Sequence, residues 1–169
     1  MKPLLLVDGY NVIGAWNVPK AENLSIEEAR KRLVDLIADY AGYSGEEVIV
    51  VFDGHYTDRT MRSHATHHGV EVVFTKHAES ADNYIEAMCQ RAPKWRHVRV
   101  ATSDSVEQTV ALGRGAVRIS SREFLVQLSQ VRSAGRGHMR EAGVSRGDIF
   151  SRLPPHLREI FERMRRGEE

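Results

Sequence analysis

The stretch Pro3-Leu4-Leu5-Leu6-Val7-Asp8-Gly9 is a short apolar run that ends in an aspartate and a glycine. Glu47 to Phe52 (EVIVVF) repeats this form and ends in Asp53-Gly54. Short apolar runs rich in β-branched residues predict buried strands. Three further runs of this kind are Val70 to Phe74, His97 to Ala101 and the weaker Ala116 to Ile119.

The segments between these runs have the period of helices. A capping box, Ser25-Ile26-Glu27-Glu28, opens a helix that we expect to end near Gly42. Three more helices are expected: one from Ser80 to about Arg91, a short one after Asp104 and one from about Ser121 to Val131. Strands that alternate with helices predict an α/β fold of three layers, α/β/α, with a mostly parallel central sheet.

The C-terminal part of the chain differs from the rest. From about Ser133 to Arg152 it is rich in Gly and Arg and has little periodicity, which predicts a flexible or partner-ordered segment. Pro154-Pro155 then opens a final amphipathic helix. We therefore expect a domain over residues 1–132 and a basic extension over residues 133–169 that ends in a helix.

Composition and charge narrow the class of protein. The chain has 169 residues, 41% of them hydrophobic and 28% charged, as is typical of one globular core. A lone Cys89 and an N-terminal apolar run far shorter than the ~18 residues of a membrane span indicate a cytoplasmic protein with no membrane partner. Residues 1–112 carry a net charge of −4 and residues 113–169 one of +5, and the C-terminal part contains Arg but no Lys. An acidic body with an Arg-rich end favours a phosphate-bearing partner.

Carboxylates follow three of the four clear strands, namely Asp8, Asp53 and Asp104. The carboxyl ends of parallel strands lie at one edge of a sheet, where ligands of such folds bind. Asp82 stands in the first turn of the helix after the remaining strand, where the helix dipole keeps a carboxylate ionised. We expect these four side chains to converge.

Converging carboxylates repel one another, and their pKa values rise unless a cation lies between them. Mg²⁺ prefers oxygen ligands, and a bound divalent ion lowers the pKa of a water and neutralises phosphoryl charge. The pattern thus favours metal-assisted phosphodiester hydrolysis. An aspartate after a strand is also a common helix cap or turn residue, an equally good interpretation of each one alone. Asp53-Gly54 is the weakest candidate because Asp-Gly is a frequent turn dipeptide.

Four motifs in order resemble the NYN branch of the PIN-like nucleases, in particular the bacterial YacP-like group. They are VDGYNV (7–12), VFDG (51–54), ESADNYIE (79–86) and ATSD (101–104). The resemblance covers the body to about residue 130, and the Arg-rich tail that ends in an amphipathic helix is also similar to that group.

The resemblance implies a PIN-like (NYN) fold and a Mg²⁺- or Mn²⁺-dependent endoribonuclease. Asp8, Asp82 and Asp104 match the family's acidic metal site, Asn11 a companion polar position and Asp53 a further acidic position. Asn83 follows Asp82, so the implied ligand set has no adjacent pair of acids there. The YacP-like group also implies messenger RNA decay linked to the ribosome.

The leading hypothesis is hydrolysis of single-stranded RNA, because duplex RNA hides its bases in a deep, narrow groove. Arginines would hold the flanking phosphates, although each one alone is more often a solvated surface residue. The candidates are Arg114, Arg118, Arg122, Arg136, Arg140 and Arg146.

Other polar residues have weaker claims. Asn11 and Thr102-Ser103 offer neutral donors to a phosphate or a carboxylate, or serve as turn and cap residues. Asp58 and Glu79 are predicted to be solvated. A polar loop is expected to face solvent or RNA rather than to hold zinc. It contains His55, His64, His67, His68, Arg59 and Arg62.

Two other classes of protein compete with a nuclease. A non-catalytic RNA- or ribosome-binding module with vestigial carboxylates is disfavoured by the acidic body. A phosphatase of similar architecture needs an aspartate where Tyr10 stands. A receiver domain needs paired acids after the first strand and a lysine after the last, where Ser120-Ser121 stand.

Overall fold

A computed structural model describes residues 1–54, 61–102 and 115–141, with side chains up to residue 135. The strands are β1 (Leu4–Asp8), β2 (Glu47–Phe52), β3 (Ser63–His67), β4 (Val70–Phe74), β5 (Val98–Thr102) and β6 (Val117–Ser120). The helices are α1 (Gly9–Ala15), α2 (Asn17–Ala21), α3 (Ile26–Ser44), α4 (Ala81–Arg91) and α5 (Ser121–Glu141).

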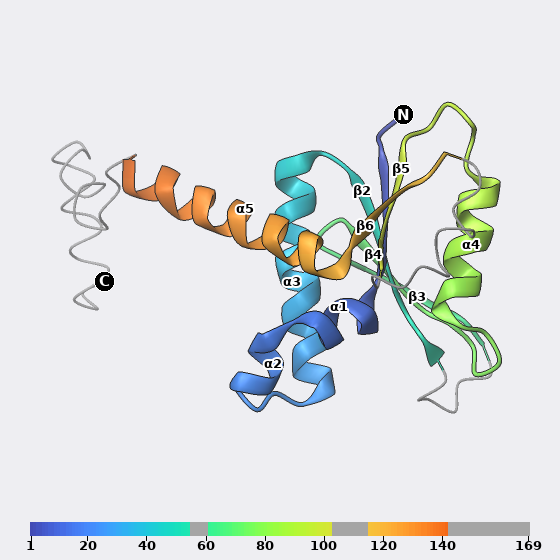
Figure 1. Cartoon of the computed structure of the whole chain (residues 1–169), viewed down its shortest axis with the longest axis horizontal. Helices are drawn as coiled ribbons and strands as arrows, with labels where there is room; N and C mark the ends of the chain where they lie inside the picture. The colour runs from blue at the N-terminus through green and yellow to red at the C-terminus, as the bar shows by residue number, and fades with distance from the viewer. Residues whose placement is uncertain (55–60, 103–114, 142–169) are drawn as a thin grey trace, which may run out of the picture. The chain divides into compact units, whose positions relative to one another are not determined.

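The strands form one six-stranded sheet in the order β3-β4-β2-β1-β5-β6 (Figure 1). Every pairing is parallel except that of β3 with β4. The mostly parallel sheet is thereby confirmed. From β1 the chain first builds the sheet outward on one side, through β2, β4 and β3. It then crosses to the other side of β1 to add β5 and β6, so the direction of the strand order reverses between β1 and β5. Ligands of such sheets bind beyond the carboxyl ends of the strands at this reversal.

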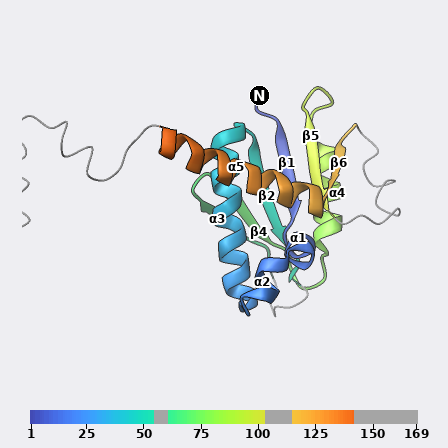
Figure 2. The same cartoon turned by 60° about the vertical axis from the view of Figure 1, so that its left-hand side comes forward.

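Helices cover both faces of the sheet, as predicted (Figures 1 and 2). Alternate residues of a strand point to opposite faces, so Leu5 and Val7 of β1 pack with Val12 of α1 and Leu33 of α3. Phe124 of α5 belongs to the same cluster. On the other face, Leu4 and Leu6 pack with Tyr84 and Ile85 of α4. The fold therefore has three layers, with β1 buried at its centre.

The edge of the sheet differs from the sequence prediction. Residues 63–67 lie within the predicted polar loop but form β3, which pairs antiparallel with β4. The tight turn between the two strands places His68 at φ 46° and Gly69 at φ 82°, the left-handed conformations of a two-residue hairpin turn. The side chains of this edge strand are largely exposed, so its sequence lacks the alternation of apolar and polar residues from which a strand is predicted.

The helices also differ at two places. The short helices α1 and α2 follow β1 directly and were not predicted, because neither is long enough for a clear apolar stripe. Helix α5 extends to Glu141, so the prediction of an aperiodic segment from Ser133 was wrong for residues 133–141. The rest of that segment and the predicted final helix lie outside the described residues.

Backbone contacts divide the chain into two units, Met1–Arg132 and Ser133–Glu169. The interpretation of the second unit as an extension separate from the nuclease domain stays a prediction. No helix in the described ranges is long and apolar enough to cross a membrane.

Candidate functional site

Asp8 is the last residue of the central strand and is 5% exposed. It is also the N-cap of α1, because its Oδ1 accepts a hydrogen bond of 3.3 Å from the backbone N–H of Asn11. The Asn11 side chain donates a second bond, from Nδ2 to Asp8 Oδ2, at 2.7 Å. The capping interpretation is therefore correct, and capping also fixes the orientation of the carboxylate at the carboxyl edge of the sheet.

The electrostatics of Asp8 bring in a second carboxylate. Burial raises the pKa of Asp8 to about 6, the hydrogen bonds from Asn11 oppose this rise, and the neighbouring Asp82 carboxyl adds to it. Asp82 is exposed in the first turn of α4, on the opposite face of the sheet from α1. Two carboxylates from different layers thus lie side by side at the end of β1. A divalent cation would relieve their repulsion.

Asp53 lies just past β2 and joins that strand to the start of α4. Its Oδ2 accepts a hydrogen bond of 3.5 Å from the backbone N–H of Ala81, the first residue of α4. Asp53 therefore contacts the backbone of Ala81, the residue that directly precedes Asp82.

Thr75 makes a second connection between β2 and α4. Its buried Oγ1 accepts a 2.8 Å bond from the N–H of Gly54 and donates a 2.6 Å bond to the carbonyl of Glu79. A Cβ at Gly54 would lie only 1.8 Å from the carbonyl oxygen of Thr75, so this approach requires glycine. These contacts set where α4 begins and hence where Asp82 stands. Sequence reasoning missed Thr75, whose only sequence signal is a polar residue directly after a buried strand.

Glu79 was predicted to be solvated, and this was wrong. Its side chain is 12% exposed and pairs with Arg62, whose Nε donates to Oε2 at 2.6 Å and whose Nη2 bonds the other oxygen. The hydrogen bonds from Arg62 hold the pKa of Glu79 below its ordinary value. The Arg62 guanidinium also lies 5.2 Å from the centre of the Tyr84 ring. Arg62 therefore holds the segment that precedes α4 against the helix. Asp58, the other residue predicted to be solvated, lies outside the described residues.

The third predicted ligand, Asp104, and its neighbour Ser103 lie outside the described residues. Thr102 ends β5 and is buried. Within residues 1–54, 61–102 and 115–141, no three His, Cys, Asp or Glu side chains are grouped so that they could hold a metal ion. The described part of the chain thus brings together two of the predicted metal ligands, Asp8 and Asp82.

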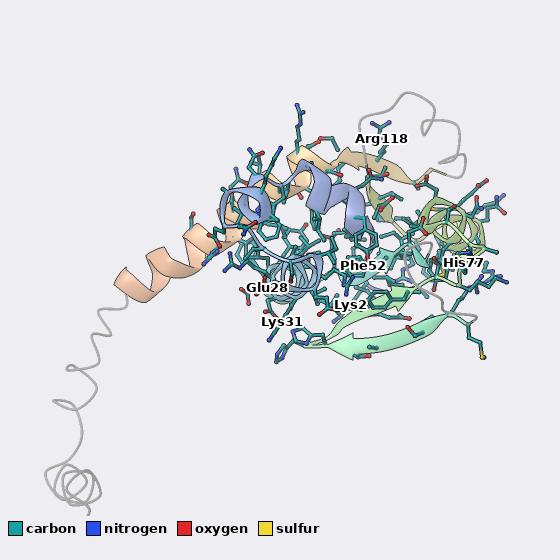
Figure 3. The ribbon with its side chains drawn as sticks, turned by 90° about the horizontal axis from the view of Figure 1, so that it is seen from below. Lys2, Glu28, Lys31, Phe52, His77 and Arg118 are labelled. Atoms are coloured by element: carbon teal, nitrogen blue, oxygen red, sulfur yellow. The ribbon has the colours of Figure 1, made fainter. Side chains whose placement is uncertain are left out.

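The predicted RNA-binding arginines are described only in part. Arg118 is half-buried on β6 (Figure 3). Arg122 is exposed in the first turn of α5. Arg136 and Arg140 lie on α5, where only the backbone is described. Arg114 and Arg146 lie outside the described residues. The grouping of these arginines stays a prediction.

The histidines around β3 pair with separate carboxylates. His64 Nδ1 lies 2.8 Å from Glu71 Oε1, and His67 Nε2 lies 2.6 Å from Asp35 Oδ1. His55 and Arg59 lie outside the described residues. Each of these two histidines therefore has a carboxylate partner of its own.

A pocket of about 520 Å³ lies between α2, α3 and α5, and none of the predicted site residues lines it. Its lining includes Trp16, Leu36, Leu125 and Leu128. The candidate site at the carboxyl edge is thus separate from this pocket.

Comparisons with known proteins give one consistent result. The family model for the YacP-like NYN domain matches residues 5–166. The chain is 39% identical over 169 residues to "Uncharacterized protein YacP" of Bacillus subtilis strain 168, covering 98% of each chain. The crystal structure of Rae1 (YacP) from Bacillus subtilis is similar with a TM-score of 0.71 and 38% identity, covering 98% of this chain and 95% of that one. The crystal structure of a tryptophan-to-leucine mutant of Rae1 is similar with a TM-score of 0.70 and 36% identity, covering 95% and 98%.

Proposed function

The chain belongs to the YacP-like NYN domain family, whose members are nuclease-like, and from that premise we propose that it is a metal-dependent endoribonuclease. Its substrate is single-stranded RNA, in which it hydrolyses phosphodiester bonds. The observation that carries this proposal is the buried Asp8 carboxylate at the end of the central strand, with Asp82 beside it.

The donor set suits Mg²⁺ or Mn²⁺. Asp8 and Asp82, together with Asp104 from beyond β5, would hold the ion, and Mg²⁺ is typically bound by one or two carboxylates with waters and substrate phosphates. A bound divalent ion lowers the pKa of a water and neutralises charge on the phosphoryl group. Asn11 keeps the Asp8 carboxylate turned to the edge of the sheet, and Thr75 and Asp53 hold the start of α4 so that Asp82 faces Asp8.

The physiological substrate we propose is messenger RNA in a ribosome-linked decay pathway in the cytoplasm. This part of the proposal rests on the family, and the Arg-rich residues 113–169 with their net charge of +5 support a phosphate-rich partner. The test therefore includes ribosomes.

The test is cleavage of end-labelled single-stranded RNA with Mg²⁺, Mn²⁺ or EDTA, with and without translating ribosomes. We expect metal-dependent cutting by the wild-type chain and none by Asp8→Asn or Asp82→Asn. Asp39→Asn is the matched control, because this exposed aspartate of α3 is not at the carboxyl edge. Full activity of Asp82→Asn would remove Asp82 from the site. Folded wild-type protein that cuts in no condition would favour the non-catalytic RNA- or ribosome-binding module.

A further inference from the structure

Arg30 occupies an unusual position for a charged residue. It stands three and seven residues before Leu33 and Ile37, both fully buried, so all three residues share the face of α3 that packs on the sheet. The Arg30 side chain is half-buried there. Withdrawing a guanidinium from water costs free energy unless partners replace the lost hydration.

The described residues that contact Arg30 leave most of its hydrogen-bond donors unused. Its Nη1 donates a 2.9 Å hydrogen bond to the Tyr10 hydroxyl, and its guanidinium carbon lies 5.6 Å from the centre of the Phe74 ring. A guanidinium has five N–H donors. Among the described side chains, no carboxylate pairs with Arg30, in contrast to four other arginines of the same domain. Those arginines are Arg32, Arg62, Arg96 and Arg99.

The contacts of Arg30 connect it to residues at the same edge of the sheet as the candidate site. Tyr10 comes two residues after Asp8, and its ring lies 5.1 Å from that of Phe52, the last residue of β2. Phe52 in turn stacks at 5.3 Å on Phe74, the last residue of β4. Figure 3, seen from below, shows Phe52 among the side chains between α3 and the sheet. Three aromatic rings thus lie under the carboxyl ends of β1, β2 and β4, with Arg30 in contact with two of them.

We propose that Arg30 binds a phosphate of the RNA strand next to the scissile bond, with the Tyr10 hydroxyl holding its guanidinium in place. This inference rests on the nuclease function proposed above. A polyanion that approaches Asp8 and Asp82 meets like charge, so a cation at the same edge is needed to hold the backbone there. A guanidinium with N–H groups to spare matches a phosphate in a bidentate geometry, and the aromatic contacts fix its plane.

The experiment compares four full-length variants with the wild-type chain. Arg30→Met keeps the aliphatic stem and removes the charge, Arg30→Lys keeps a charge without the fork, and Tyr10→Phe removes the accepting hydroxyl. Arg32→Met is the matched control, because Arg32 lies on the same helix, is exposed and pairs with Glu22. The affinity for an end-labelled single-stranded oligouridylate is measured in EDTA by fluorescence anisotropy over a series of salt concentrations. KM and kcat for its cleavage are then measured with Mg²⁺.

We expect Arg30→Met to weaken binding about tenfold and to reduce the slope of log Kd against log salt by about 0.7, the value for one phosphate contact on a single strand. KM should rise more than kcat falls. Arg30→Lys should restore part of the affinity, Tyr10→Phe should weaken binding less than Arg30→Met, and Arg32→Met should behave as wild type.

If Arg30→Met, folded by circular dichroism, binds as tightly as Arg32→Met, the inference is wrong while the nuclease function stands. If the wild-type chain neither binds nor cuts the oligonucleotide, the proposed function fails and this inference falls with it.

Discussion

The raised pKa of Asp8 makes the stability of the chain depend on pH. The pKa rises from 3.8 to about 6 on folding, so the contribution of Asp8 is favourable below about pH 4 and is lost as pH rises through 6. A shift of about two pKa units corresponds to about 3 kcal/mol for a buried carboxyl. In EDTA, we therefore expect Asp8→Asn to gain up to about 3 kcal/mol of unfolding free energy relative to wild type between about pH 4 and pH 8. Urea unfolding across this range measures the difference, and a difference independent of pH would contradict it.

The neighbouring carboxylates of Asp8 and Asp82 predict how a metal ion changes the stability of the chain. An ion that binds only the folded chain stabilises it by about 2.7 kcal/mol at a hundred times its Kd. We expect Mn²⁺ to raise the thermal midpoint of the wild-type chain and of Asp39→Asn, and to have little effect on Asp8→Asn and Asp82→Asn. Differential scanning fluorimetry with and without EDTA tests this. Equal shifts in all four proteins would indicate that the ion binds elsewhere.

At the scale of single residues, the sequence predicted the two carboxylates that lie together at the candidate site but not the residues that hold them in place. Asp8 and Asp82 could be predicted because carboxylates after strands and in first helical turns follow known rules. Thr75 and Arg62 could not, because each acts through a partner far along the chain, Gly54 or Glu79. Arg30 gave a weak signal, a cation on the apolar stripe of a predicted helix.

The junction between β2 and α4 depends on a close backbone approach at Gly54. A Cβ there would meet the Thr75 carbonyl at 1.8 Å, so the backbone must shift, and we expect Gly54→Ala to destabilise the fold by about 1–3 kcal/mol. Gly42→Ala is the matched control. Nothing lies within 4 Å of a Cβ at this exposed position of α3, so the change should add up to about 1 kcal/mol of helix stability. Urea unfolding of both variants measures these effects, and two equal effects would rule out the steric explanation.

The hydroxyl of Thr75 is expected to matter as much as its shape. Thr75→Val keeps the volume but leaves the buried N–H of Gly54 without its acceptor, which should cost about 1–3 kcal/mol. Thr66→Val, on the exposed edge strand β3, is the control and should change stability little. Because Thr75 also holds the Glu79 carbonyl, its loss should raise the Mn²⁺ concentration needed for the stabilising shift. Chemical unfolding and a metal titration of each variant separate these two effects.

Strands and helices could be predicted where burial imposes an apolar pattern on the sequence. They could not be predicted where most of their side chains are exposed. The central strands β1 and β2 and the helix α3, with its capping box, carry patterns set by burial. β3 is an exposed edge strand whose pairing is set by the hairpin turn at His68 and Gly69. Helix α5 continues past Val131 through Gly- and Arg-rich residues that break the apolar period, and Gly has a low helix propensity, so its length was underestimated.

The strand order of the whole molecule explains why distant motifs converge. β1 lies between β2 and β5, so the carboxyl ends of these three strands, at Asp8, Phe52 and Thr102, lie at one edge although they are far apart in the chain. The sequence could supply the alternation of strands and helices, but the order of strands in the sheet follows from which side of β1 each connection takes. The sequence predicts that Asp8 and Asp82 converge, and the structure adds that one comes from the central strand and the other from the helix α4 on one face of the sheet.

The separation of charge along the chain predicts how RNA affinity responds to salt. The acidic body lowers the affinity for a polyanion, so contacts from the Arg-rich end should supply most of the salt dependence. Replacing Arg136, Arg140 and Arg146 together by Gln in the full-length chain should reduce the slope of log Kd against log salt by about 0.7 for each phosphate that these arginines bind. The control replaces the exposed lysines Lys20, Lys31 and Lys94, which removes the same charge from the body. Because overall charge alone would lower both slopes equally, a larger change in the arginine variant identifies direct phosphate contacts, and equal changes would contradict them.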